Sequence, residues 1–224
     1  MSTAKTPTFR FAPSPNGLLH LGHAYSALLN QQAAKKLNGV CRLRIEDIDK
    51  ARSQQKYIAA IYRDLHWLGL SWPEPVRQQS KHMADYKSAI DQLNELGLLY
   101  PCFASRGDIK TYWSAQNPAE IKRDPDQALL YPGLCKHLPK EAAKQRIRAG
   151  EPYTLRLHMD KALSRAQHLT GGDLRYETFE INGNEQQQAR YHEMLNPSRW
   201  GDVIIARKDV PTSYHLSVVV DDHL

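Results

Sequence analysis

The sequence predicts an α/β protein, a Rossmann-type doubly wound parallel sheet with an inserted α+β subdomain. Short apolar segments at 8–12 and 40–45 are typical of strands. Amphipathic segments follow them at 21–37 and 53–68, and this alternation of strand and helix indicates βαβ units. Between about 101 and 200 the chain becomes more polar and richer in turns, which indicates an insertion into the domain. A chain of 224 residues is long enough for both.

Each early element has a local signal in the sequence. The segment 8–12 alternates polar and apolar residues, and the helix that follows ends at Asn38-Gly39, a common C-terminal stop. The second strand, 40–45, reads V-C-R-L-R-I. The helix after it has apolar residues at helical spacing, and a third helix is predicted at 83–96.

The later segments predict a return to the sheet. Within the insertion, 153–157 reads as a short strand and 183–188 as weakly structured. Segments 202–207 and 214–220 also read as strands, and the second contains the V-V-V run of a strand buried on both faces. We therefore expect three regions, which are the first part of the Rossmann-type domain at 1–100, the insertion at 101–200 and a shortened return to the sheet at 201–224.

Composition restricts the classes of protein. A formal charge of +6 and a pI near 9.2 favour an anionic partner, with nucleic acid as the leading candidate, although a mildly basic enzyme has the same charge. Three cysteines cannot all pair, which argues against a disulfide framework. There is no apolar run of about 20 residues and no apolar core of a signal peptide. We expect a cytoplasmic protein without membrane association.

The segment between the first strand and the first helix carries the strongest functional signal. It reads R-F-A-P-S-P-N-G-L-L-H-L-G-H from Arg10 to His23. The spacing of His20 and His23 puts both imidazoles on one face of a helix, and the first turn presents unpaired N–H groups and a positive dipole end. These features suit a polyphosphate, and Gly22 leaves room for a nucleotide against the backbone. The alternative is that His20 is a helix cap and His23 a solvated residue.

This segment resembles the signature around the HIGH motif of class I aminoacyl-tRNA synthetases, in its glutamate- and glutamine-specific form. R-I-E-D-I-D at 44–49 and S-Y-H-L-S-V-V-V-D-D at 213–222 resemble two later blocks of the family, and W-G-D-V-I-I-A-R-K-D at 200–209 leads into the second. The blocks occur in the family's order and span nearly the whole chain. The resemblance implies the HUP-like catalytic domain of a ligase that uses ATP and Mg²⁺ to activate glutamate and then transfers it to tRNA.

The resemblance also implies roles for single residues. His20 and His23 match the catalytic histidines, and the implied ATP-binding residues are Pro13, His20, Gly22 and His23. Arg10 would bind the side-chain carboxylate of glutamate, because a guanidinium binds a carboxylate through two parallel hydrogen bonds. Glu46 would receive the α-ammonium group. The implied glutamate site is completed by Ala12, Ser14 and Tyr214.

Taken singly, several of these residues also fit a purely structural role. Arg10 fits an exposed strand position, and Glu46 fits a helix cap or an ion pair with Arg44 or Arg52. For the neighbouring carboxylates Asp47 and Asp49, we expect capping or solvated positions and not catalytic roles.

Related enzymes carry a zinc element of the pattern C-x-C followed by Y-x-x-x-C. Here Ala104 replaces one cysteine, and three candidate ligands are left, which are Cys102, Tyr131 and Cys135. A structural zinc site normally has four ligands, so a bound zinc ion is the less favoured expectation. His137 and Ser105 are open as substitute ligands.

Within the family, the chain is most similar to a short group of glutamyl-tRNA synthetase paralogues that lack an anticodon-binding domain. This similarity implies the queuosine base of tRNA(Asp) as the acceptor, and we expect a monomer. The family's lysine-rich KMSKS loop and the arginine of a V-R-G-x-D segment lie beyond 213–222, whereas this sequence ends at Leu224. We expect either a shortened form or a variant that adenylates inefficiently. Three alternatives stay open: a truncated synthetase for tRNA(Glu), a small-molecule nucleotidyltransferase and a non-catalytic tRNA-binding fragment.

Overall fold

The computed structural model describes residues 6–180, 188–193 and 196–224, which divide into two compact units at Met83 and Ala84. Apart from Gln188, the segment predicted to be weakly structured lies outside the described residues. Within the described ranges, no helix combines the length and the apolar character needed to cross a membrane. The first unit contains β1 (Thr8–Phe11), α1 (Leu21–Lys36), β2 (Val40–Ile45), α2 (Gln55–Trp67), β3 (Arg77–Gln78) and the 3₁₀ helix η1 (Gln79–Lys81).

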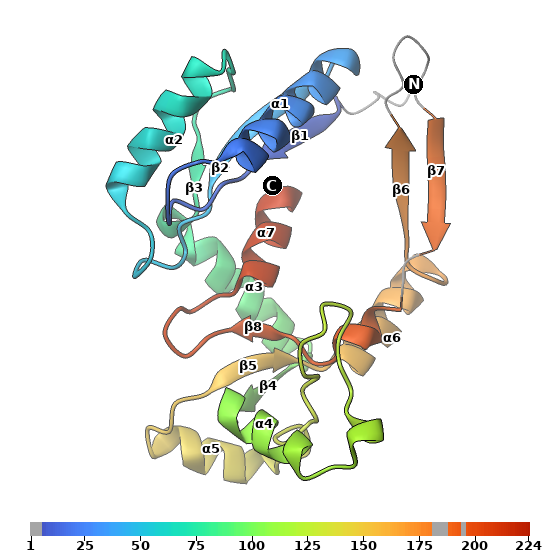
Figure 1. The fold of residues 1–224 in the computed structure, drawn as a ribbon. Helices are drawn as coiled ribbons and strands as arrows, with labels where there is room; N and C mark the ends of the chain where they lie inside the picture. Colours follow the sequence, from blue (N-terminus) through green and yellow to red (C-terminus); the bar gives the residue numbers. More distant parts are fainter. Residues whose placement is uncertain (1–5, 181–187, 194–195) are drawn as a thin grey trace. The chain divides into compact units, whose positions relative to one another are not determined.

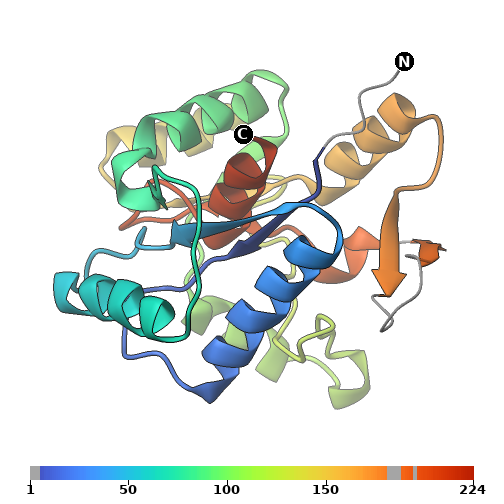
Figure 2. The ribbon, with the colours of Figure 1, turned by 90° about the horizontal axis from the view of Figure 1, so that it is seen from above.

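The first unit is built on a parallel sheet of strand order β1-β2-β3 (Figure 1). Phe11 pairs with Leu43 in the register of β1 and β2, and paired residues of parallel neighbours point to the same face. Leu43 and Ile45 therefore share one face, where they pack against apolar side chains of both helices. Figure 2 shows α1 and α2 on the same side of β1 and β2. The predicted βαβ arrangement is confirmed.

The opposite face of this sheet is basic. Arg10 pairs with Arg42 in the strand register, and Arg44 lies two residues further along β2. Because side chains alternate between faces, all three arginines project away from the apolar core. The predicted strand at 40–45 matches β2 residue for residue. The two-residue strand β3 was not predicted, because it is too short to show any periodicity.

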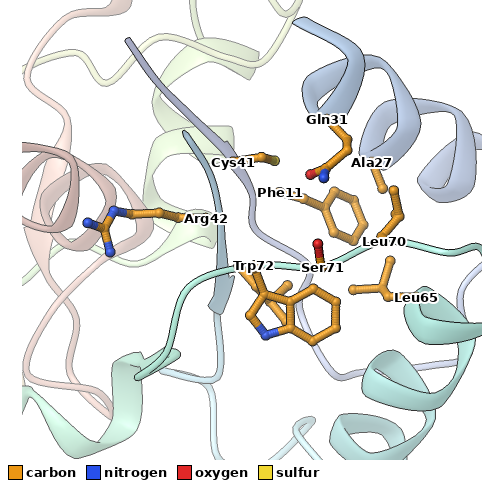
Figure 3. A pocket seen from close by; sticks show the side chains of 10 residues that line it. Phe11, Ala27, Gln31, Cys41, Arg42, Leu65, Leu70, Ser71 and Trp72 are labelled. Carbon is orange, nitrogen blue, oxygen red and sulfur yellow. The ribbon is translucent and has the colours of Figure 1, made fainter. Parts of the chain in front are cut away.

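A small cavity lies in the core of the first unit, and Figure 3 shows its lining side chains. Phe11, Leu65 and Leu70 point toward it, while Arg42 points away from the other labelled side chains. Its volume is about 20 Å³, which is room for about one water molecule. Sites for drug-sized ligands and cofactors usually measure about 300–1,000 Å³, so this cavity is a packing gap.

The second unit contains mainly helices and antiparallel strands (Figure 1). It begins with α3, whose first residue Met83 lies at the boundary. Its elements are α3 (Met83–Glu95), β4 (Leu99–Cys102), α4 (Arg106–Ser114), η2 (Pro118–Glu120), α5 (Lys140–Arg148), β5 (Thr154–Leu157), α6 (Met159–Thr170), β6 (Arg175–Glu180), β7 (Gln188–Glu193), η3 (Pro197–Trp200), β8 (Ile204–Ala206) and α7 (Tyr214–His223).

The strands of the second unit form an antiparallel sheet of order β4-β5-β8 and a separate pair, β6-β7. We expected residues 201–224 to return to the parallel sheet. Among the described strands, β8 instead pairs with β5, inside the region 101–200 that we expected to be the insertion. The compact units also divide near residue 83 and not near residue 100.

The prediction of a strand at 214–220 is wrong, because these residues begin the helix α7. Ser213 caps the helix, and its hydroxyl accepts a hydrogen bond from the Leu216 N–H at 3.3 Å. Leu216 and Ser217 are buried on one side, whereas Val219 is 65% exposed. The valine run suggested a strand because β-branched residues favour strands. The cap and the one-sided burial override that preference.

Candidate functional site

The predicted ATP and glutamate residues of the first unit lie on and around the loop between β1 and α1, except for Glu46, which follows β2. This loop begins where β1 ends, and ligands of parallel sheets bind at the carboxyl ends of the strands. Two backbone hydrogen bonds fix it: the Glu46 N–H donates to the Pro13 carbonyl at 3.1 Å, and the Gln54 N–H donates to the Pro15 carbonyl at 3.0 Å. The structure thus brings 12–15 beside Glu46, at the end of the next strand.

His20 and His23 cap helix α1 reciprocally. Nδ1 of His20 accepts a hydrogen bond from the Gly22 N–H at 3.1 Å, and Nδ1 of His23 accepts one from the His20 N–H at 3.2 Å. The two rings lie against each other, with centroids 3.8 Å apart. The alternative role of His20 as a cap is therefore real, and it is compatible with phosphate binding because the cap uses one ring nitrogen.

The caps also determine which nitrogen of each ring carries the proton. A nitrogen that accepts an N–H bond carries no hydrogen, so each neutral ring is protonated on Nε2. Burial, and secondarily the nearby His20, lowers the pKa of His23 below its ordinary value. At neutral pH, His23 is therefore an uncharged ring with one N–H donor. The Nε2–H groups of the two rings, beside the N-terminus of a helix, suit the oxygens of a phosphate chain.

The structure shows a reason for glycine at position 22 that the sequence did not reveal. A Cβ added at this position would lie 3.1 Å from Cε1 and 3.2 Å from Nδ1 of His20. Such contacts are tighter than most real Cβ contacts, so a side chain would push the capping ring out of place. We expected Gly22 to make room for a nucleotide, and what the structure shows is that it makes room for the His20 ring.

The other predicted residues on β1 and the following loop differ in exposure. Arg10 and Ser14 are exposed, Ala12 is half-buried and Pro13 is buried. Arg10 lies on the basic face of the sheet, beside its register partner Arg42. Arg10 therefore has the exposed strand position expected from the residues alone, and its role in binding a carboxylate stays a prediction.

Glu46 forms an ion pair with Arg44. Nη2 of Arg44 lies 2.9 Å from Oε1 of Glu46, and their side chains are 6% and 8% exposed. Nε of Arg44 donates to the same oxygen at 3.3 Å. One of the alternative roles of Glu46 is thus observed, and the pair holds its carboxylate at the end of β2 in a fixed orientation.

Tyr214 belongs to the second unit, which is described separately from the residues above. It is the first residue of α7, directly after the cap Ser213, and it is 60% exposed. We expected it at the start of a strand, and the structure places its exposed ring at the start of a helix.

Asp47 is a structural residue whose partners the sequence could not reveal. It is 4% exposed and accepts hydrogen bonds from Gln78 Nε2 at 2.6 Å, from the Ser80 N–H at 2.8 Å and from the Ser80 hydroxyl at 2.7 Å. These partners lie more than 30 residues away. Asp49 instead pairs with Arg52 at 2.8 Å near the surface, as a capping or solvated residue would.

The three candidate zinc ligands come together in the second unit. The Cys102 thiol donates to the Tyr131 hydroxyl oxygen at 3.3 Å, and the Cys135 N–H donates to the same oxygen at 2.7 Å. Neither substitute ligand joins them: Ser105 caps α4 and bonds to Asp108, and His137 is exposed. Across the described ranges, His, Cys, Asp and Glu form no group of three or more that could hold a metal ion.

A sequence model of the tRNA synthetases class I (E and Q), catalytic domain, matches residues 8–224. The chain is 41% identical over 217 residues to the glutamyl-Q tRNA(Asp) synthetase of Rhodobacter capsulatus, a match that covers 95% of this chain and 71% of that protein. It is 34% identical over 215 residues to the glutamate–tRNA ligase of a Hydrogenobaculum species, covering 96% of this chain and 41% of that protein.

A solved structure of a glutamate tRNA ligase from Elizabethkingia meningosepticum shares the fold. Its TM-score is 0.69 at 23% identity, and the match covers 98% of this chain and 42% of that chain. The chain therefore spans about two fifths of the length of the glutamate–tRNA ligases that it matches. Since the family match covers nearly every residue and the signature loop forms a capped helix start, this chain belongs to the class I glutamate and glutamine tRNA synthetases and carries sequence of their catalytic domain.

Proposed function

We propose that this chain activates glutamate with ATP and transfers it to tRNA, with the queuosine base of tRNA(Asp) as the acceptor. The observation that carries the proposal is the reciprocal cap of His20 and His23 at the start of α1. It leaves an N–H donor on each ring beside the positive end of a helix dipole, and the family match supplies ATP as the phosphate compound.

In the first step, a carboxylate oxygen of glutamate forms a bond to the α-phosphorus of ATP. The bond between that phosphorus and the oxygen that bridges it to the β-phosphorus breaks, and pyrophosphate leaves. Negative charge increases on the phosphate oxygens in the transition state, and donors fixed in advance stabilise it best. His20 and His23 are such donors, with Pro13 and Gly22 forming the adjacent wall. Mg²⁺ bound with ATP would neutralise part of the phosphate charge.

Glutamate would be recognised at both of its ends. Arg10 on the basic face of the sheet would bind the side-chain carboxylate, and Glu46 would receive the α-ammonium group. Glu46 is held in place by Arg44, whose guanidinium partly compensates the buried carboxylate. Ala12 and Ser14 would complete the glutamate site within the first unit.

The choice of acceptor is supported by similarity. The 41% identity to a glutamyl-Q tRNA(Asp) synthetase exceeds the 34% identity to a glutamate–tRNA ligase. A formal charge of +6 suits a polyanionic partner such as tRNA. In the second step, the acyl group passes to a hydroxyl of the acceptor and AMP leaves.

Glutamate-dependent exchange of pyrophosphate into ATP tests the first step. His20→Asn keeps a residue that caps helices well but removes the Nε2–H donor. We expect it to reduce exchange at least about 100-fold while the melting temperature stays close to that of the wild type. His168→Asn, at an exposed position on α6, is the matched control and should exchange normally. Arg10→Lys should raise the KM for glutamate much more than the KM for ATP, because lysine lacks the two-pronged geometry.

Transfer of [14C]glutamate tests the second step, with native tRNA(Asp), a queuosine-free transcript and tRNA(Glu) as acceptors. We expect acid-labile transfer to the native tRNA(Asp) alone. Transfer to tRNA(Glu) would instead identify a glutamyl-tRNA synthetase fragment. Pyrophosphate exchange without dependence on glutamate would indicate a small-molecule nucleotidyltransferase, and tRNA binding without exchange would indicate a non-catalytic fragment.

A further inference from the structure

A buried arginine accompanies the three candidate zinc ligands. Arg156 projects from β5, and its Cζ lies 3.8 Å from the centroid of the Tyr131 ring. The residue is 7% exposed, and Nη1 donates to the Asp202 carbonyl at 2.7 Å. A guanidinium keeps its charge at any accessible pH, so the cluster already contains a fixed cation.

The donor set does not fit a structural zinc ion. Such a site normally has four ligands, and this cluster has two thiols and one phenol, with Ala104 at the position of the third thiol. The phenol oxygen is also occupied, since it accepts hydrogen bonds from the Cys102 thiol and from the Cys135 N–H. These residues therefore do not make up a complete zinc site.

Charge gives a second reason. A zinc ion bound by the thiolates of Cys102 and Cys135 would lie beside a guanidinium that is largely shielded from water, and two thiolate charges would not balance both cations. The aromatic ring and the thiol suit one cation well, because the ring face attracts a guanidinium and the sulfur accepts its hydrogens.

We propose that Arg156 takes the place of the metal, so that its guanidinium joins the segments around Cys102, Tyr131 and Cys135 in a zinc-free cluster. Arg156 contacts the ring of the loop residue Tyr131, and it bonds to Asp202 just before β8. Tyr131 in turn contacts β4 through Cys102. The Arg156 side chain thus contacts two other segments directly and is connected to β4 through Tyr131, where a metal ion would bind its ligands directly. This proposal is independent of the proposed function.

Zinc content and melting temperature of the purified full-length chain test the proposal, and neither depends on activity. The wild type, expressed with zinc in the medium, should hold well below one zinc per chain, and EDTA should leave its melting temperature unchanged. Arg156→Met removes the cation and should lower the melting temperature by about 5 °C, with no recovery on adding zinc. Arg148→Met, at an exposed position on α5, is the matched control and should melt like the wild type.

A double variant tests why the metal is excluded. Ala104→Cys combined with Arg156→Met restores the third thiol and removes the cation, and it should take up close to one zinc per chain. The proposal is overturned if the wild type holds about one zinc that EDTA strips with a fall in melting temperature. It is also overturned if Arg156→Met melts like Arg148→Met, or if the double variant stays free of metal. If Arg156→Met does not fold, the wild-type zinc content and its response to EDTA still decide the matter.

Discussion

The interiors of the two units are stabilised by different kinds of side chain. The first places the apolar side chains of a parallel sheet against two helices, and its buried core is mostly aliphatic. The second has an apolar cluster of its own, and its antiparallel sheet also encloses buried polar groups, among them Arg156, Thr154 and Asp202. Apolar periodicity can be read locally in a sequence, whereas a buried polar network depends on partners that are far apart in the chain.

Asp202 is the centre of the network in the second unit. It is 6% exposed and accepts hydrogen bonds from the Tyr100 hydroxyl at 2.6 Å and the Met159 N–H at 3.0 Å, while Lys136 Nζ lies 3.1 Å away. Burial, and then the bond to Asp202, raises the pKa of Tyr100 far above its usual range. The phenol therefore stays a donor, and the carboxylate joins β4, α6 and the segment before β8.

The largest effect should come from removing this centre. Asp202→Ala takes the carboxylate acceptor away from the buried Tyr100 hydroxyl and from the Lys136 ammonium. We expect a loss of about 3 kcal/mol in the free energy of unfolding, measured by urea denaturation. Asp209→Ala, whose partner Arg207 lies at the surface, should cost less than about 1 kcal/mol. Equal losses in the two variants would mean that the network contributes no more than a surface ion pair.

In the first unit, the corresponding buried carboxylate is Asp47. Asp47→Ala removes the acceptor for Gln78 and Ser80 and should cost about 2 kcal/mol in the free energy of unfolding. Asp49→Ala breaks an exposed pair with Arg52 and should cost well under about 1 kcal/mol. Urea denaturation of both variants would show whether the stability of the first unit depends less on its buried carboxylate than that of the second unit does. A larger loss for Asp47→Ala than for Asp202→Ala would contradict that difference.

The sequence predicted the first unit better than the second. Strand 40–45 was placed to the residue, because its alternating residues bury one face of a sheet. The strand prediction at 214–220 failed, because a cap at Ser213 and burial on one side decide its conformation. At the candidate site, the sequence revealed His20 and His23 but not their mutual capping, which depends on ring orientation. The contact of Arg156 with Tyr131 had no sequence signal, since 24 intervening residues hide the pairing.

Gly22, in the first turn of α1, allows a smaller and more local test. Gly22→Ala would place a Cβ 3.1 Å from the His20 ring, so the cap would weaken and the helix would lose about 1 kcal/mol. The control is Gly17→Ala in the loop before α1, where an added Cβ meets nothing within 4 Å. Thermal unfolding and pyrophosphate exchange should both separate the two variants. If both variants behave alike, the close approach of His20 to Gly22 is not what requires glycine.

The smallest expected effect is a pH dependence that each unit contributes through one histidine. Burial lowers the pKa of His23 with help from His20, and burial lowers the pKa of His158 with help from Lys161. A lowered pKa means that the folded chain binds fewer protons than the unfolded chain. Stability should therefore fall as the pH drops below about 6.5, the ordinary value for histidine, and through the lowered folded values.

Unfolding measured between about pH 7.5 and pH 5.5 would separate the two contributions. His23→Asn and His158→Asn should each flatten part of this slope, and a variant with the full wild-type slope would show that its histidine keeps an ordinary pKa. In His23 the lowered pKa also has a chemical consequence, because a ring that stays neutral keeps Nδ1 free of a proton to accept the His20 N–H. Protonation would turn that acceptor into a donor, so the slope assigned to His23 reports when the cap of α1 opens.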